Sequence, residues 1–179
     1  MKQEIHPFDC AGQILKAMPK GILLTTKSGD KVNTMTIGWG HIGIEWGKPI
    51  FIAFVRENRY TRQMLDENGE FTVNIPWEGE CREILSYCGT KSGRNTDKIR
   101  DLQLHLEEPL HISVPGIREL PLTLECKVIY RQVQDLSAIT ENLRIRYYPR
   151  EVGSDHPGSN QDVHIAYYGE ILSAYTIVE

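Results

Sequence analysis

Three clusters of hydroxyl, amide and cationic side chains stand beside apolar segments in the first half of the chain. The first covers residues 33–39, the second covers residues 56–61 directly after an apolar run, and the third covers residues 89–94 together with Lys98. Glycine lets the backbone approach a ligand closely, and cations with hydroxyl donors stabilise negative charge. The three clusters together predict a site for a cofactor that carries an anionic group.

The second cluster has the strongest physical rationale. Asn58 is expected to cap a helix over residues 59–68, with Gly69 ending it. The start of a helix presents unpaired N–H groups and partial positive charge, so it suits a phosphate. Arginine can bond two phosphate oxygens at once. Basic loop residues are more often solvated surface, and that alternative stays open for each cluster taken singly.

A self-sufficient catalytic set is absent from the sequence. There is no G-x-S-x-G, no H-E-x-x-H, no phosphate loop ending in Gly-Lys-Ser/Thr, and no G-x-G-x-x-G after a strand. The six histidines show no pair at the helical spacing of a metal site. We therefore expect no metal and no catalytic side chain, and any difficult chemistry would come from a bound cofactor.

Length and charge limit the remaining possibilities. A chain of 179 residues is expected to form one domain, residues 1–179. The net charge of −4 disfavours nucleic acid and anionic membranes as partners. The N-terminal residues do not resemble a signal peptide, and no apolar run reaches membrane-spanning length. Four scattered cysteines then favour a reducing, cytoplasmic location, with Cys81 and Cys88 interpreted as packing residues rather than a redox or metal pair.

The pattern of apolar residues predicts mainly strands with short helices between them. Strands are expected over residues 21–26, 31–39, 41–45, 50–55, 70–75, 110–114, 122–133 and 163–178, the first two as a hairpin and the last bulged near Gly169. Short helices are expected over residues 11–18, 59–68, 79–87, 96–102 and 138–143, and a surface loop over residues 148–161. This order favours an α+β, mainly β protein built on a closed or partly closed antiparallel barrel. The strand over residues 70–75 is expected to be half-buried.

An ordered series of short motifs runs through nearly the whole chain. It comprises residues 33–36 with Trp39, Lys48-Pro49, Val55-Arg56-x-x-Arg59-Tyr60-Thr61, residues 71–76, Cys88-Gly89-x-x-Ser92-Gly93-Arg94-x-x-Asp97-Lys98, residues 124–126 and residues 169–171. In this order the motifs resemble the flavin reductase-like, FMN-binding split-barrel family, and within it the flavoredoxin branch. The resemblance implies a Greek-key-like split β-barrel with short inserted helices.

The resemblance also implies roles for particular residues. The flavin ring and ribityl chain would lie along Asn33, Thr34, Met35, Thr36 and Trp39; Arg56, Arg59, Tyr60 and Thr61 would bind the phosphate and ribityl chain; and Ser92, Gly93, Arg94 and Lys98 would close over the cofactor. The family implies a homodimer with FMN near the subunit interface, because a small barrel cannot bury a flavin alone.

The chain departs from the family at one motif. Related reductases often carry Gly-Asp-His before the last strand, with the histidine near the nicotinamide, whereas this chain has Asp162-Val163-His164. His164 is therefore either a substrate-side residue or a surface histidine at the end of a strand. The segment over residues 139–160 is also longer than in compact members, and is expected to cover the site or the dimer edge.

Three functions follow as hypotheses. The first is an FMN-dependent oxidoreductase that takes electrons from NAD(P)H. The second is a non-enzymatic FMN electron carrier, like flavoredoxin, that a partner protein reduces. The third is a binding module that uses the same barrel without flavin.

Overall fold

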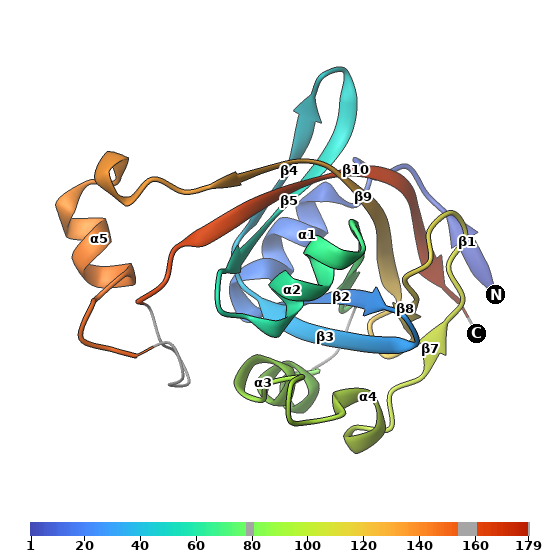
Figure 1. The fold of residues 1–179 in the computed structure, drawn as a ribbon. Coiled ribbons are helices and arrows are strands. Elements are labelled where there is room, and N and C mark those ends of the chain that lie inside the picture. The colour runs from blue at the N-terminus through green and yellow to red at the C-terminus, as the bar shows by residue number, and fades with distance from the viewer. Residues whose placement is uncertain (78–80, 154–160, 179) are drawn as a thin grey trace.

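A long, strongly curved antiparallel sheet dominates the computed structural model, which describes residues 1–77, 81–153 and 161–178 (Figure 1). Its strands follow the order β3-β2-β6-β9-β10-β5-β4, with β1 added beside β10. The bounds are β1 Lys2–Glu4, β2 Ile22–Ser28, β3 Lys31–Ile37, β4 Gly40–Glu45, β5 Lys48–Arg56, β6 Glu70–Ile75, β9 Leu122–Val133 and β10 His164–Ile177. Within these described residues β3 and β4 do not pair, so the predicted barrel is split rather than closed.

Short helices connect the strands. They are α1 Ala11–Ala17, η1 Met18–Lys20, α2 Tyr60–Glu67, α3 Arg82–Thr90, α4 Lys98–Asp101, η2 Leu136–Ala138 and α5 Glu141–Tyr147. Figure 1 shows α2 on one side of β3, with α3 and α4 on the other. None of the helices in the described residues is long and apolar enough to cross a membrane.

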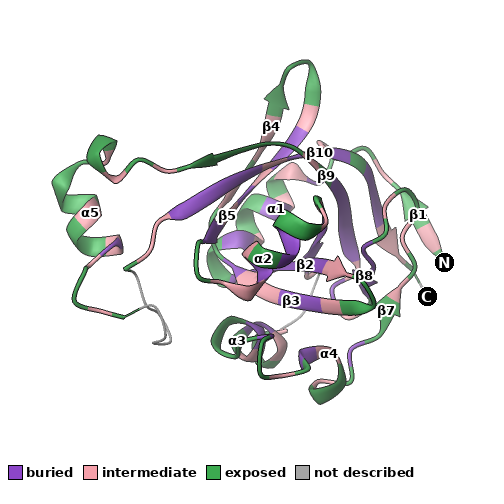
Figure 2. Ribbon diagram, in the orientation of Figure 1, coloured by how far each residue is buried: buried purple, intermediate pink, exposed green. Residues whose placement is uncertain are grey.

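The core lies inside the curve of the sheet. Phe51, Phe71 and Tyr167 are almost completely buried there, and Figure 2 shows the buried residues concentrated in the strands. Gly169 is required at its position because a Cβ atom there would lie 2.5 Å from Cζ of Phe71. The register of β10 against β9 shifts between Tyr168 and Gly169, which confirms the predicted bulge. Cys81 and Cys88 are free thiols that share a second apolar cluster, so the packing interpretation is confirmed.

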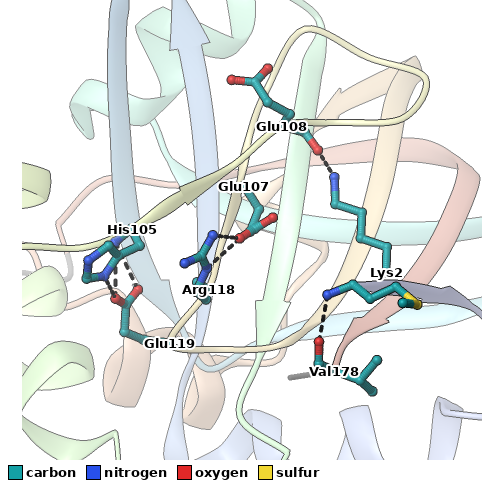
Figure 3. A network of polar contacts seen from close by, with 8 residues as sticks. Lys2, His105, Glu107, Glu108, Arg118, Glu119 and Val178 are labelled. Atoms are coloured by element: carbon teal, nitrogen blue, oxygen red, sulfur yellow. Dashed lines mark hydrogen bonds and ion pairs between the residues drawn. The ribbon is translucent and has the colours of Figure 1, made fainter.

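A small ribbon made of β7 (Leu106–Glu107) and β8 (Gly116–Ile117) is fastened by charged groups (Figure 3). His105 Nδ1 lies 2.7 Å from the Glu119 carboxylate, and Arg118 pairs with Glu107. The ammonium group of Lys2 donates to the carbonyl oxygen of Glu108, which links the ribbon to the N-terminal strand. These contacts hold the ribbon beside the paired termini.

Several predictions about local structure are wrong. Residues 110–114 form bends instead of a strand, because the carboxylates of Glu125 and Glu70 accept hydrogen bonds from their backbone N–H groups. Strand β6 is buried on both faces rather than one, since it lies between β2 and β9 and its polar side chains are covered. The residue that caps α2 is Arg59 rather than Asn58, whose backbone N–H donates to Asp162 Oδ2.

The predicted hairpin of β2 and β3 is confirmed, and β9 has the predicted bounds. Within residues 139–160, α5 contributes no buried residue and extends outward from the sheet (Figure 2). The expectation that this segment covers the site extends to residues 154–160, which lie outside the described residues, as do residues 78–80 at the start of the helix expected over residues 79–87.

Candidate cofactor-binding site

A cavity of about 810 Å³ lies along the outer edge of β3. This volume is within the range of pockets that hold a cofactor-sized ligand. Strand β3 is the end of the sheet order and pairs only with β2 among the described residues. The cavity is lined by β3, by the start of α2, by the loop between α3 and α4, and by described residues just before β10: Asn33, Met35, Asn58, Arg59, Tyr60, Thr61, Cys88, Gly89, Thr90, Lys91, Ser92, Gly93, Arg94, Asn95, Lys98, Gly153, Gln161 and Asp162.

Lys98 bonds the edge of β3 beside this cavity. The carbonyl oxygen of Thr34 points outward and accepts a 2.8 Å hydrogen bond from Lys98 Nζ. In an antiparallel strand the N–H and C=O of one residue point the same way, so the N–H of Thr34 faces the same edge. The hydroxyl of Thr34 instead lies within the sheet, 3.0 Å from Thr25 Oγ1. Thr34 is completely buried, so neither its backbone nor its side chain is exposed to this cavity.

The start of α2 contributes an arginine whose charge is not neutralised. Arg59 lines the cavity, and its guanidinium makes no hydrogen bond or ion pair with any residue in the described part of the chain. Thr61, in the first turn of α2, also lines the cavity and accepts a 2.9 Å hydrogen bond from Asn33 Nδ2. Because the Thr61 oxygen is the acceptor in that bond, its hydroxyl hydrogen remains available to donate to a ligand.

Lys98 is a buried cation at the floor of the cavity, only 4% exposed. Its Nζ atom donates to the carbonyl oxygens of Thr34 at 2.8 Å and Cys88 at 2.9 Å. An ammonium group has three donors, so one remains for a ligand. Burial lowers the pKa of Lys98 to about 8, with Cys88 opposing that effect and the positive charge of Arg59 adding to it.

The loop between α3 and α4 approaches β3 so closely that Gly93 is required. A Cβ atom on Gly93 would lie 2.0 Å from Oδ1 of Asn33 and 3.0 Å from Cδ1 of Tyr60. The loop is fixed by Lys31, whose Nζ atom donates to the Gly93 carbonyl at 2.9 Å and lies 4.6 Å from the Tyr60 ring centre. Arg94 extends across the cavity and donates to the Asn58 carbonyl at 2.8 Å.

A smaller cavity of about 180 Å³ adjoins the first, and both are lined by Met35 and Arg59. Its other lining residues are Thr36, Ile37, Gly38, Trp39, Phe54, Arg56 and His164. Aromatic rings enclose it: Trp39 lies 5.0 Å from His164 and 5.2 Å from Tyr147, measured between ring centres. The two cavities form one elongated site with a cationic section and an aromatic section.

Arg56 serves the second section in a different way from Arg59. Its guanidinium donates to the carbonyl oxygens of Asp162 at 2.6 Å and Tyr147 at 3.1 Å. It also lies 5.1 Å from the centre of the Tyr148 ring. Burial lowers the pKa of Arg56, although Asp162 and Tyr148 oppose that change. Arg56 thereby ties the end of α5 and the residues just before β10 to the site.

The structure brings most of the predicted residues together. Nine line the larger cavity: Asn33, Met35, Arg59, Tyr60, Thr61, Ser92, Gly93, Arg94 and Lys98. Thr36, Trp39, Arg56 and His164 line the smaller one, and the side chain of Thr36 donates to the Leu85 carbonyl at 2.6 Å. Thr34 lines neither cavity.

Some lining residues were not predicted as site residues. Cys88 and Gly89 belong to a motif that the sequence had already singled out, so their neighbours in that motif were a usable signal. Asp162 belongs to the Asp162-Val163-His164 stretch that the sequence had also singled out, whereas Phe54 carried no signal of its own. No group of three or more metal-ligating side chains lies together within the described ranges.

The fold and the elongated cleft define a mainly β, antiparallel split-barrel protein with a site suited to a cofactor. Residues 15–176 match the family described as the flavin reductase like domain. The chain therefore belongs to the flavin reductase-like family, which confirms the resemblance predicted from the sequence. Membership in this family supports a flavin as the ligand.

The chain is also similar to two flavoredoxins of known structure and to one uncharacterised protein. The flavoredoxin of Desulfovibrio vulgaris (Miyazaki F) is 23% identical, with a TM-score of 0.64 over 88% of this chain and 69% of that one. The flavoredoxin of Methanosarcina acetivorans is 25% identical, with a TM-score of 0.62 over 88% and 68%. An uncharacterised protein of Archaeoglobus fulgidus is 30% identical over 62% of this chain, and the match spans only 62% of that relative's length.

Proposed function

We propose that this protein binds FMN and transfers electrons through it from NAD(P)H to an acceptor. The observation that carries the proposal is the guanidinium of Arg59, which pairs with none of the described residues and lies with the buried ammonium of Lys98 in the wall of the larger cavity. Burial lowers the pKa of Lys98, and like-charge repulsion from Arg59 adds to that lowering. An anionic group in the larger cavity would relieve this repulsion.

The chemistry of the donors fits a phosphate better than a neutral ligand. Arg59 offers a guanidinium that no described residue pairs with, Lys98 one remaining N–H, and Thr61 one hydroxyl hydrogen. The first turn of α2 adds its unpaired backbone N–H groups. These donors come from separate elements and converge on one cavity of about 810 Å³.

The smaller cavity suits the other end of the cofactor and the donor. FMN supplies two-electron redox chemistry when it is bound, so this chain's residues need only bind it, orient it and exclude water. Met35 and Thr36 of β3 line this cavity and would lie along a flat ring. Trp39 and His164, whose ring centres are 5.0 Å apart, would border that ring. Because no side chain is needed as an acid or base, the catalytic set stays empty.

A non-enzymatic electron carrier is the second candidate. The fold is shared with two flavoredoxins, and the motif before β10 departs from that of related reductases. In this candidate a partner protein reduces the FMN. Residues 1–179 would act as one domain in either case, and the four free thiols are compatible with the reducing, cytoplasmic location that we propose.

Anaerobic reduction separates these functions. The purified protein, loaded with FMN, is mixed with NADH or NADPH without oxygen, and absorbance in the flavin bands is followed. Bleaching at a rate well above that of free FMN supports the oxidoreductase. Bound flavin that neither nucleotide bleaches leaves the electron carrier, and failure to take up FMN leaves a flavin-free binding module.

The pKa of Lys98 makes FMN affinity depend on pH. A bound phosphate favours the protonated lysine, so affinity is expected to fall as pH rises above about 8, by up to about tenfold per pH unit. The stability of the FMN-free protein has the opposite pH dependence. Unfolding restores the ordinary Lys98 pKa of 10.5, so the folded state loses its proton first as pH rises. The contribution of Lys98 to the free energy of unfolding therefore becomes more favourable between about pH 8 and pH 10.5.

Flavin fluorescence titrations at several pH values measure this dependence. Riboflavin, which lacks the phosphate, is the matched ligand control and should show a flatter profile. Equal profiles for FMN and riboflavin above pH 8 would remove Lys98 from the phosphate site.

A homodimer is part of the proposal because large apolar side chains are exposed together. Trp46 at the tip of the β4–β5 hairpin is 57% exposed, and Ile44 beside it is 70% exposed. The Trp46 ring lies 5.9 Å from Tyr130 and 6.1 Å from Tyr168, so the apolar surface continues onto β9 and β10. Contiguous apolar surface of this kind marks an interaction site.

Trp46→Glu is therefore expected to weaken the dimer by about thirtyfold or more, as is usual for a central aromatic residue of an interface. Sedimentation velocity across a concentration series measures the shift toward monomer. Leu15→Glu on α1 is the control, since Leu15 is also exposed, at 52%, but lies outside this surface. A dimer that survives Trp46→Glu unchanged would place the interface elsewhere.

A further inference from the structure

His164 is held by a short chain of hydrogen bonds that the proposed function does not use. Its Nδ1 atom lies 2.8 Å from the hydroxyl oxygen of Tyr148. The same hydroxyl donates a 3.0 Å hydrogen bond to Oε1 of Gln134. The backbone N–H of Gln134 donates to the His164 carbonyl at 3.0 Å, which keeps the two residues side by side.

The directions of these bonds determine the tautomer of His164. A phenol has one hydrogen to donate, and Tyr148 gives it to the amide oxygen of Gln134, which can only accept. The Tyr148 oxygen can then only accept from the histidine. Nδ1 of His164 must therefore carry the ring hydrogen, and Nε2 must carry the lone pair.

The ring of His164 lies beside two aromatic rings, those of Trp39 and Phe54, that line the smaller cavity. His164 is one of the lining residues of that cavity, although its side chain is largely buried. Nε2 makes no hydrogen bond to any residue in the part of the chain that the structure describes. Burial and the positive charges of Arg56 and Arg59 lower the pKa of His164 to about 3, so the ring stays neutral at physiological pH.

We propose that Gln134 and Tyr148 are positioning residues that fix His164 as the Nδ1–H tautomer, so that Nε2 accepts a hydrogen bond from a planar ligand carrying an N–H group. The carboxamide of a nicotinamide ring has such a group, and this identification of the ligand rests on the proposed function. The aromatic walls formed by Trp39 and Phe54 suit a flat ring. His164 acts here as an acceptor and not as an acid.

The tautomer can be measured without any activity. Long-range proton–nitrogen correlation spectra of the full chain, labelled with nitrogen-15 in histidine, distinguish the two neutral tautomers, and His164→Asn assigns the signal. We expect Nδ1–H in the wild-type protein, with and without FMN. The Nε2–H tautomer in the wild-type protein would overturn the proposal.

Two variants at one position separate positioning from simple packing. In Gln134→Leu the Tyr148 hydroxyl loses its acceptor and can donate to Nδ1, so the tautomer is expected to shift toward Nε2–H. In Gln134→Glu a carboxylate still accepts from Tyr148, so the wild-type tautomer is expected to persist. Tyr148→Phe keeps the ring beside Arg56 and should leave a mixture of tautomers. An unchanged tautomer in both Gln134→Leu and Tyr148→Phe would contradict the positioning role.

Kinetics then tests the ligand. Gln134→Leu should raise the KM for NAD(P)H about three- to tenfold, the effect of one hydrogen bond, with kcat nearly unchanged and Gln134→Glu close to wild type. An unchanged KM would overturn the assignment of the ligand to Nε2. If the wild-type protein does not oxidise NAD(P)H at all, the donor in the proposed function fails, while the spectra still decide the role of Gln134 and Tyr148.

Discussion

Replacing both Arg59 and Thr61 with alanine is expected to weaken FMN binding by about 2–4 kcal/mol, or about thirtyfold to nearly a thousandfold in Kd. The two residues are the most available donors in the larger cavity. Arg59 has no partner among the described residues, and Thr61 accepts from Asn33 while keeping its own hydrogen. Both side chains would donate charge-assisted hydrogen bonds to the phosphate, and the double variant removes these bonds.

If the loss of FMN affinity comes from the phosphate contacts, a ligand without phosphate and a variant outside the cavity should both be much less affected. Riboflavin affinity should change far less than FMN affinity in the double variant. Arg62→Ala is the matched protein control, because Arg62 is on the same helix but pairs with Asp66 at 2.8 Å and does not line the cavity. Unchanged FMN affinity in the double variant, by isothermal calorimetry, would remove both residues from the site.

Gly93→Ala is expected to lower FMN affinity by tenfold or more, because the added methyl group cannot fit without moving the loop. The Cβ atom would lie 2.0 Å from Oδ1 of Asn33 and 2.7 Å from its Cγ. Asn33 also bonds Thr61, so displacement of Asn33 would disturb two walls of the cavity at once. Overpacking at a buried site costs about 1–3 kcal/mol.

Thermal unfolding and flavin titration together measure this change. Gly12→Ala is the matched control, since a Cβ atom at Gly12 meets nothing within 4 Å and alanine favours a helix. The control should bind FMN normally and be at least as stable as the wild type. A Gly93→Ala variant with wild-type affinity would show that the approach of the loop to β3 is not needed for binding.

Strands with strong local patterns were predictable from the sequence. The alternation of apolar residues over β9 and the two strands around Gly29 predicted the correct elements. The alternation did not predict the burial of β9, since Thr123 and Glu125 are buried together with the apolar residues between them. The half-buried prediction for β6 failed for a tertiary reason. Thr72 and Asn74 look like a solvent-facing row, but Thr72 donates to the Pro115 carbonyl at 2.8 Å and Asn74 Nδ2 donates to Thr123 at 3.2 Å.

The strand predicted over residues 110–114 shows a second limit. Its short apolar run is typical of a strand, yet carboxylates from β6 and β9 accept hydrogen bonds from its backbone N–H groups. Glu125 is completely buried and accepts from the backbone of Leu110 and His111. A sequence pattern cannot show that a distant carboxylate will replace the hydrogen bonds of a neighbouring strand.

The site was predictable in kind but not in every detail. Cations, hydroxyls and glycines in an ordered series located its walls, because ligand-binding residues keep their chemical types. Which residues reach the cavity depends on the fold: Thr34 is completely buried beneath it, and Arg56 is tied to Tyr147 and Asp162. The bonds from Gln134 through Tyr148 to His164 join residues that no local pattern connects.

The open edge of β3 has a consequence for association between chains. An unpaired strand edge is a template on which another strand can add, and aggregation starts from such edges. Here a buried lysine occupies one position of the edge by bonding the Thr34 carbonyl, and exposed Lys31 stands at its start. Charged residues beside an edge deter such addition. Lys98 and Lys31 therefore disfavour the addition of another polypeptide strand to β3, while the cavity beside the strand remains accessible to a small ligand.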